Sequence, residues 1–296
     1  MSIRFEDVGH RLKAFRVASG LRPEAIAARV GISRAALYRY ERGAVAKIDT
    51  LERFGAVYDV SVPSLLGVGV EYVASFVAFL ERLRQLEETA EDIVIFFGPV
   101  SYLLSSEHYD AALRVMLNES VPKDSEERHK ALADIERIMD ILNHRKTSYR
   151  ARQPKVTMLL ATAEIIRVLQ DGFVGNATLS GDERIRRRRQ AADEVRHIAS
   201  LLEEPSNGLQ TGVIVDTAPS MNFQLFRKNG NATLTLSPFR LGAHPNVRVG
   251  VAMITKAPEA ISLHERVAAD LWKRALKGQE AATRIRALID EYGPQD

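Results

Sequence analysis

The feature that most constrains the fold is a pair of short helical segments separated by one glycine. The first, Pro23–Val30, has apolar residues at helical spacing and opens on a proline, whose missing N–H costs nothing in a first turn. Gly31 follows as a residue able to take a left-handed conformation, and Ser33 is a suitable N-cap for the second segment, which Gly43 ends. Helices joined by so tight a turn must cross steeply, so a small residue, Ala27, is expected at the crossing.

The segment Pro23–Tyr40 resembles the lambda-repressor/Cro-like (XRE) family of helix-turn-helix proteins. The small residue, the turn glycine and the apolar positions match, and Tyr40-Glu41-Arg42-Gly43 is similar to the family's aromatic-Glu-x-Gly ending. The resemblance continues through Ile48–Tyr58 and Val60–Leu66, which are similar to the family's fourth and fifth helices. It implies an all-α, five-helix DNA-binding domain over residues 1–68.

In this docking geometry the N-terminal residues of the second, recognition helix face base edges in the major groove. Here these residues are Ser33, Arg34 and Ala35, followed one turn later by Tyr38 and Arg39. Arg34 has the donors to bind guanine bidentately, a contact worth on the order of 1–3 kcal/mol of discrimination. We expect Ala35 against a thymine methyl group, and Tyr38 and Arg39 beside phosphates or flanking the bases.

Other basic residues of this domain are candidates for contacts to the DNA backbone. The family usually has a phosphate-binding glutamine where this chain has proline, so that contact is expected to shift to Arg22 or to backbone N–H groups at the helix N-terminus. Arg16, Arg42 and Lys47 either bind phosphates, which positions a protein without specifying sequence, or are simply solvated. Glu41 is expected to form an ion pair with a nearby arginine.

The charge distribution agrees with a nucleic-acid-binding head. Residues 1–70 hold eleven Lys and Arg against seven Asp and Glu, a net charge of +4, whereas the remaining residues hold 30 against 31. The absence of cysteine excludes disulfides and thiolate metal sites, and it suits a reducing cytosol. The sequence shows no signal-peptide pattern and no apolar run of the roughly eighteen residues that a membrane span needs. We therefore expect a cytoplasmic protein with no membrane partner.

A connecting region, residues 69–90, is expected to form one long amphipathic helix over Val70–Glu88. Its apolar residues fall into two stripes, which implies two packing partners. Two interpretations stay open: a helix that forms a dimer interface, or a core helix covered on both sides by the C-terminal domain. A homodimer is expected in either case, because one small module rarely supplies enough specific affinity for DNA.

Residues 91–296 mix strands with helices and are expected to form an α/β (α+β) effector-sensing or assembly domain. Strands are expected at Ile93–Phe97, Lys155–Leu160, Gly212–Asp216, Asn222–Lys228, Ala232–Pro238 and Val247–Ile254. Helices are expected at Glu107–Asn118, Ser125–Arg150, Ala163–Gln170, Asp182–Glu203, Pro258–Leu276 and Gln279–Tyr292. Asn229-Gly230 between two of the strands is a strong hairpin signal.

No residue pattern in this domain indicates catalysis. His264-Glu265 lacks the second histidine of a zinc-binding helix, and no G-x-S-x-G motif occurs. We therefore expect no enzymatic activity, no cofactor and no metal site. Because α/β sheets bind ligands at strand ends, Gly98, Tyr102 and Arg240 are the candidate effector-binding residues.

The sharpest charge feature of the second domain is Arg184–Arg189, with five arginines in six residues. Three interpretations stay open. The run forms a solvated helix face balanced by acidic neighbours such as Asp193 and Glu194, or it binds an anionic effector, or it makes a second contact with DNA.

Together these features predict a homodimeric, sequence-specific regulator of transcription that binds double-stranded DNA and responds to a small-molecule effector at its C-terminal domain. Two alternatives stay open. One is an antitoxin-like or other protein-interaction module that uses the same head, and the other is an enzyme fused to a DNA-binding domain.

Overall fold

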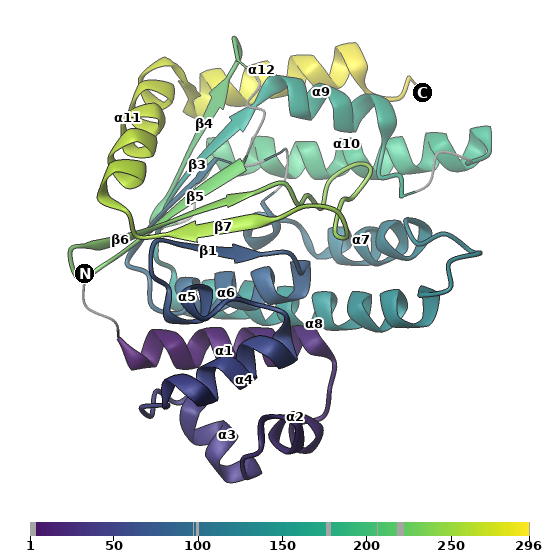
Figure 1. The fold of residues 1–296 in the computed structure, drawn as a ribbon. Helices are drawn as coiled ribbons and strands as arrows, with labels where there is room; N and C mark the ends of the chain where they lie inside the picture. Colours follow the sequence, from purple (N-terminus) through teal and green to yellow (C-terminus); the bar gives the residue numbers. More distant parts are fainter. Residues whose placement is uncertain are drawn as a thin grey trace.

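The structure, a computed structural model, describes residues 4–96, 98, 101–175, 179–205, 207–217 and 222–295. Five helices form a head at one end of the molecule, and the rest of the described chain forms a body around a mixed sheet with helices on both faces (Figure 1). The predicted fold class, an all-α head followed by a mixed α/β domain, is confirmed.

Two glycines set the geometry of the head. Gly31 ends the second helix with a φ of 73°, as the predicted turn requires. Gly9 lies where the first and third helices meet, since an added Cβ would stand 2.5 Å from the Glu41 carbonyl oxygen. The helices of the head are α1 (Phe5–Ser19), α2 (Pro23–Val30), α3 (Arg34–Glu41), α4 (Ile48–Tyr58) and α5 (Val62–Leu66).

The sheet has the strand order β1-β7-β6-β5-β2-β3-β4-β8 in the described part of the chain. Neighbouring strands are parallel from β2 through β3 to β4 and antiparallel elsewhere. The strands are β1 (Val70–Val73), β2 (Asp92–Phe96), β3 (Lys155–Ala161), β4 (Leu209–Ile214), β5 (Asn222–Lys228), β6 (Asn231–Ser237), β7 (Ala252–Thr255) and β8 (Leu276–Lys277).

The helices of the body cover the two faces of the sheet unequally. Most pack on one face, and α11 covers part of the other, where its Ala268 and Leu271 belong to the same buried cluster as Leu225 and Leu234. The core on the first face is continuous with the core of the head, because α1 packs on α6. The helices are α6 (Phe76–Glu87), η1 (Tyr102–Leu104), α7 (Glu107–Glu119), α8 (Arg128–Arg152), α9 (Thr162–Asp171), α10 (Gly181–Glu203), α11 (Pro258–Arg274) and α12 (Gly278–Tyr292).

The prediction of one helix over Val70–Glu88 is wrong. Val70–Val73 is an edge strand that pairs with β7, and the helix starts only at Phe76, where the hydroxyl of Ser75 caps it. The strand is hard to recognise in the sequence because position 71, which is buried, carries a charged residue. Glu71 is 1% exposed and faces inward, and two arginines neutralise it. Both apolar stripes of α6 are buried between α1 and α8, so α6 is a core helix and offers no dimer surface. The prediction that the C-terminal domain covers both sides is wrong, because α1 of the head covers one of them.

The predicted elements of the second domain are otherwise found at or near their expected positions. Asn229 and Gly230 have positive φ angles of 49° and 73° and join β5 to β6, as a two-residue hairpin requires. The last predicted strand, Val247–Ile254, is shorter than expected and begins at Ala252. The residues before it form a turn in which the side chain of Asn246 bonds both backbone polar groups of Val249. Phe97, the last residue of the first predicted strand, lies outside the described residues.

Candidate nucleic-acid interface

Helix α3 lies at the end of the head that is farthest from the sheet (Figure 1). It packs on α1 and α2 through Leu37, which is fully buried. Ser33, Arg34 and Ala35 at its start are exposed, as is Arg39 one turn later. The predicted reading surface is therefore directed outward, away from the body of the protein.

The turn between α2 and α3 fixes how far α3 projects. Ala27 is 3% exposed, and its carbonyl oxygen accepts a hydrogen bond of 2.9 Å from the backbone N–H of Ile32. A larger side chain at this crossing would push the two helices apart. The predicted turn at Gly31, with a buried alanine beside it, is confirmed.

The Arg34 side chain stands at the surface with weak and exchangeable partners. It forms an ion pair of 2.9 Å with Glu24, and the two side chains are 60% and 56% exposed. Its guanidinium also lies 5.6 Å from the centre of the Tyr38 ring. A surface ion pair of this kind contributes at most about 1 kcal/mol, so a base edge can replace Glu24 at little cost.

Arg16 of α1 holds α3 through an ion pair with Glu41. Its Nε and Nη2 atoms donate hydrogen bonds of 2.5 and 3.0 Å to the two carboxylate oxygens of Glu41, and its side chain is 16% exposed. Burial alone would lower the pKa of Arg16, but the Glu41 carboxylate outweighs burial and raises it. The prediction that Glu41 pairs with an arginine is confirmed. Because this pair fastens α3 to α1, a phosphate contact by Arg16 would compete with it.

The other predicted backbone-binding residues are exposed. Arg22 precedes the first turn of α2, and Lys47 precedes α4. Arg42 follows α3, and its Nε donates to the Tyr38 carbonyl oxygen at 3.2 Å. Their contacts with phosphates stay predictions, as do the base contacts of Arg34 and Ala35.

Replacing Ser33 by alanine is expected to lower the free energy of unfolding by about 1 kcal/mol. The Ser33 hydroxyl accepts a hydrogen bond of 3.1 Å from the Ala36 N–H, and alanine would leave that N–H without its cap. Urea denaturation without DNA measures the effect. Replacing Ser262, an exposed serine inside α11, is the control, and an equal or smaller loss for Ser33 would contradict the capping role.

The three candidate effector-binding residues are not shown to form one site. Tyr102 is buried, with its ring centre 6.4 Å from that of Tyr109, and Tyr109 donates a hydrogen bond of 2.8 Å to the Leu241 carbonyl. Tyr102 and Arg240 therefore lie in the same part of the body. Gly98 is described, but its neighbours 97, 99 and 100 lie outside the described residues, so this prediction is not tested.

The arginine run Arg184–Arg189 lies in α10, and two of its five arginines have structural roles. Arg187 is 5% exposed and forms ion pairs of 2.7 Å with Glu119 and 2.6 Å with Glu183. Arg188 donates hydrogen bonds to backbone carbonyls of α9 and of the end of α12. These two arginines therefore join α10 to its neighbours.

The acidic residues expected to balance this run have other partners. Asp193 pairs with Arg196 at 2.6 Å, and buried Glu194 accepts a hydrogen bond of 2.9 Å from the Ser106 N–H. The expectation of a solvated face holds in part, because Arg184, Arg186 and Arg189 are exposed and Arg186 pairs with Glu183 of the same helix at 2.7 Å. The expectation that Asp193 and Glu194 balance this face is wrong.

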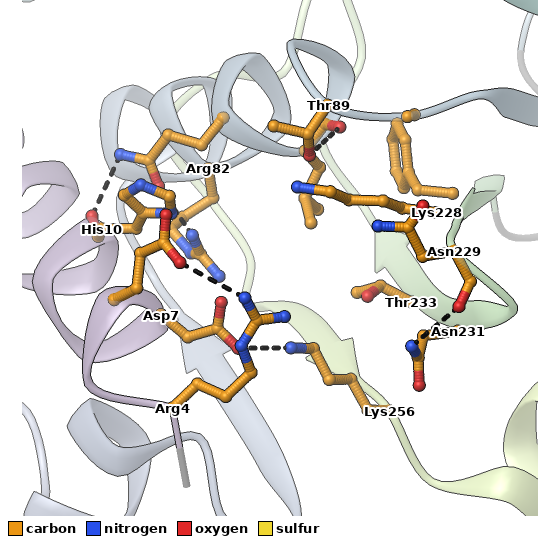
Figure 2. Close-up of a pocket in the computed structure, with 15 residues that line it drawn as sticks. Arg4, Asp7, His10, Arg82, Thr89, Lys228, Asn229, Asn231, Thr233 and Lys256 are labelled. Carbon is orange, nitrogen blue, oxygen red and sulfur yellow. Dashed lines mark hydrogen bonds and ion pairs between the residues drawn. The ribbon is translucent and has the colours of Figure 1, made fainter. Parts of the chain in front are cut away.

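Sequence reasoning missed a cavity of about 220 Å³ between the head and the body. Its walls come from the first half of α1, from α6 with the turn that follows, from the β5–β6 hairpin and from Lys256 after β7 (Figure 2). No local sequence motif predicts this cavity, because its residues come from four separate stretches of sequence. The alternation of charges in Arg4, Glu6 and Asp7 was the one signal, and it is common on helix surfaces.

The described residues were also searched for membrane-spanning helices and for metal sites. No helix among them combines the length and apolar character of a membrane span. Within the same residues, no group of three or more His, Asp or Glu side chains is arranged to hold a metal ion.

The exposed helix α3, the turn at Gly31 and the buried Ala27 beside it define a helix-turn-helix protein with a mixed α/β body. Residues 7–66 match a protein family described as a helix-turn-helix domain. A search among curated proteins found no match. The solved structure of TrmBL2, an archaeal chromatin protein described as showing a novel mode of DNA binding, is similar with a TM-score of 0.34 and 12% identity. The similarity covers 77% of this chain and 60% of that chain, and at this score it carries no argument about function.

Proposed function

We propose that the protein is a homodimeric, sequence-specific DNA-binding regulator of transcription, of the lambda-repressor/Cro type, controlled by an effector that its C-terminal domain binds. The proposal places it in the cytoplasm and assigns it no catalytic activity. The observation that carries it is the position of α3 at the end of the head away from the sheet, with Arg34 and Ala35 exposed at its start. A major groove of about 12 Å width accepts a helix presented in this way.

The contacts of Arg34 agree with a base-reading role. A guanidinium with only a solvent-exposed partner loses little when it is transferred to guanine, whereas a buried ion pair would resist the transfer. Arg16 has such a half-buried pair and instead keeps α3 at a fixed angle to α1. The head therefore separates residues that hold the reading helix from residues that are available to DNA.

Genome-wide footprinting of the full chain tests the proposal. We expect protected sites with two-fold symmetric half-sites about 34–36 Å apart, one turn of DNA, because each subunit of a dimer presents one recognition helix. On an isolated site the affinity should fall steeply with salt as phosphate contacts are lost. Uniform, sequence-independent protection would contradict a sequence-specific regulator, and a single half-site bound by a monomer would contradict the dimer.

A further inference from the structure

Among the described residues, one ion pair bridges the cavity between head and body. Lys256, after β7, donates a hydrogen bond of 2.6 Å to Asp7 of α1. Burial alone would raise the pKa of Asp7, but Lys256 outweighs burial and lowers it. This pair is therefore the direct ionic link, across the cavity, between the head and the hairpin side of the body.

The charges that line the cavity do not balance. Arg4 pairs with Glu6 at 3.2 Å, and Lys256 pairs with Asp7, so these four charges cancel. Lys228, at the end of β5, is exposed, and its ammonium group has no ion pair or hydrogen bond with any residue that the structure describes. The positive charge of Lys228 therefore has no negative partner among the described residues on the body side of the cavity.

A second uncompensated charge lies on the opposite wall. Arg82 of α6 lines the cavity and shares the carboxylate of buried Glu71 with Arg11, so three buried side chains carry a net charge of +1. The Nη1 atom of Arg11 is buried without a partner in the described structure. Burial lowers the pKa of His10, which also lines the cavity, and the charge of Arg82 lowers it further. An excess positive charge next to a cavity favours an anion in it.

We propose that this cavity binds a small organic anion through a phosphate or carboxylate group. Figure 2 shows the charged ends of Lys228, Lys256, Arg4 and Arg82 directed toward one space. Charge-assisted hydrogen bonds from such groups are about twice as strong as neutral ones. The volume of about 220 Å³ is smaller than that of cavities for drug-sized ligands, so the ligand is a small metabolite.

The uncharged part of the lining suits the remainder of such a molecule. Asn229, Asn231 and Thr233 on the hairpin provide hydrogen-bonding groups, while Leu86 and Phe226 provide apolar surface. Polar groups at fixed positions in a cavity orient a ligand. The site therefore accepts an acidic metabolite with a short polar or apolar body.

The position of the cavity links the ligand to the reading helix, and this step rests on the proposed function. An anion bound to Lys256 competes with Asp7 for the same ammonium group, which changes how α1 is held against the body. Helix α1 in turn carries α3 through the Arg16–Glu41 pair and the close contact at Gly9. Binding of the anion thus shifts the orientation of α3.

Titration of the full chain with inorganic phosphate, and separately with acetate, tests the site without DNA. Sodium chloride keeps the ionic strength constant, and isothermal calorimetry and melting temperature are the readouts. We expect saturable binding and a rise in melting temperature for the wild type. Lys228→Ala, which breaks no observed contact, should raise the dissociation constant about tenfold, and Lys228→Arg should restore binding. Lys123→Ala, an exposed lysine of the α7–α8 loop, is the matched control.

The two arms distinguish the sources of the anion. Binding of phosphate alone assigns a phosphorylated metabolite, and binding of acetate assigns a carboxylate. Absence of saturable binding of either anion, or equal binding by the wild type and Lys228→Ala, overturns the proposal. Because these measurements contain no DNA, they can succeed even if footprinting finds no operator, and they can fail while sequence-specific DNA binding is observed.

Discussion

Replacing Glu71 by glutamine is expected to lower the free energy of unfolding by about 3–5 kcal/mol. The Glu71 carboxylate accepts hydrogen bonds of 2.8 Å from the Nε atoms of both Arg11 and Arg82, and all three side chains are almost fully buried. Glutamine keeps the shape but leaves two guanidinium groups buried without a negative charge. Breaking a buried pair on one side is costly for this reason, even where the intact pair adds little stability.

Urea denaturation of the full chain at pH 7 measures this loss. Glu52→Gln is the matched control, because Glu52 is an exposed residue of α4 with no ion pair among the described residues, and its substitution should change the unfolding free energy by less than about 0.5 kcal/mol. A loss below about 1 kcal/mol for Glu71→Gln would contradict the central role of this carboxylate.

The same variant should also change how stability depends on pH. Burial alone would raise the pKa of Glu71, but Arg82 and Arg11 outweigh burial and hold it below the ordinary value of 4.5. A carboxyl whose pKa is depressed in the folded state stabilises that state above its ordinary pKa and loses this contribution as the pH falls through the folded value. The stability difference between wild type and variant should therefore shrink below about pH 4.5.

Replacing Arg34 by alanine is expected to weaken binding to the specific site by about 1–3 kcal/mol, roughly five- to 150-fold. Binding to random DNA should change far less, because a base contact adds nothing where the base is wrong. Arg22→Ala, in contrast, should weaken binding to both DNAs, because a phosphate contact is independent of sequence.

Fluorescence anisotropy on the footprinted site and on a random duplex, at one salt concentration, measures both affinities. Arg266→Ala removes an exposed arginine from α11 in the body and should leave both unchanged. Equal losses on the two DNAs for Arg34→Ala would assign that residue to the phosphates and leave the specificity of α3 to its neighbours.

The head could be predicted from sequence because its constraints are local. Pro23 and Gly31 each fix a helix end by their backbone conformation and Ser33 does so by its hydroxyl group, and the structure has all three in those roles. The hairpin at Asn229-Gly230 is local in the same sense.

What sequence reasoning missed depends on contacts between distant residues. Nothing near Glu71 in the sequence shows that Arg11 and Arg82 will neutralise it, so the sequence predicts a helix where the structure has a strand with a buried charge. The structural role of Arg187 likewise depends on Glu119, far along the chain. The anion cavity is a third case, since α1, α6 and the hairpin meet only in the folded chain.

The shared core of head and body has a consequence for how the protein comes apart. The side of α1 that α6 covers is an internal surface, so the head is not an independent domain joined to the body by a flexible linker. A cut between residues 68 and 69 would bare that surface on one fragment and its complement on the other. The stability of α3 therefore depends on the fold of the whole chain. A substitution that unfolds the body is expected to unfold the head as well.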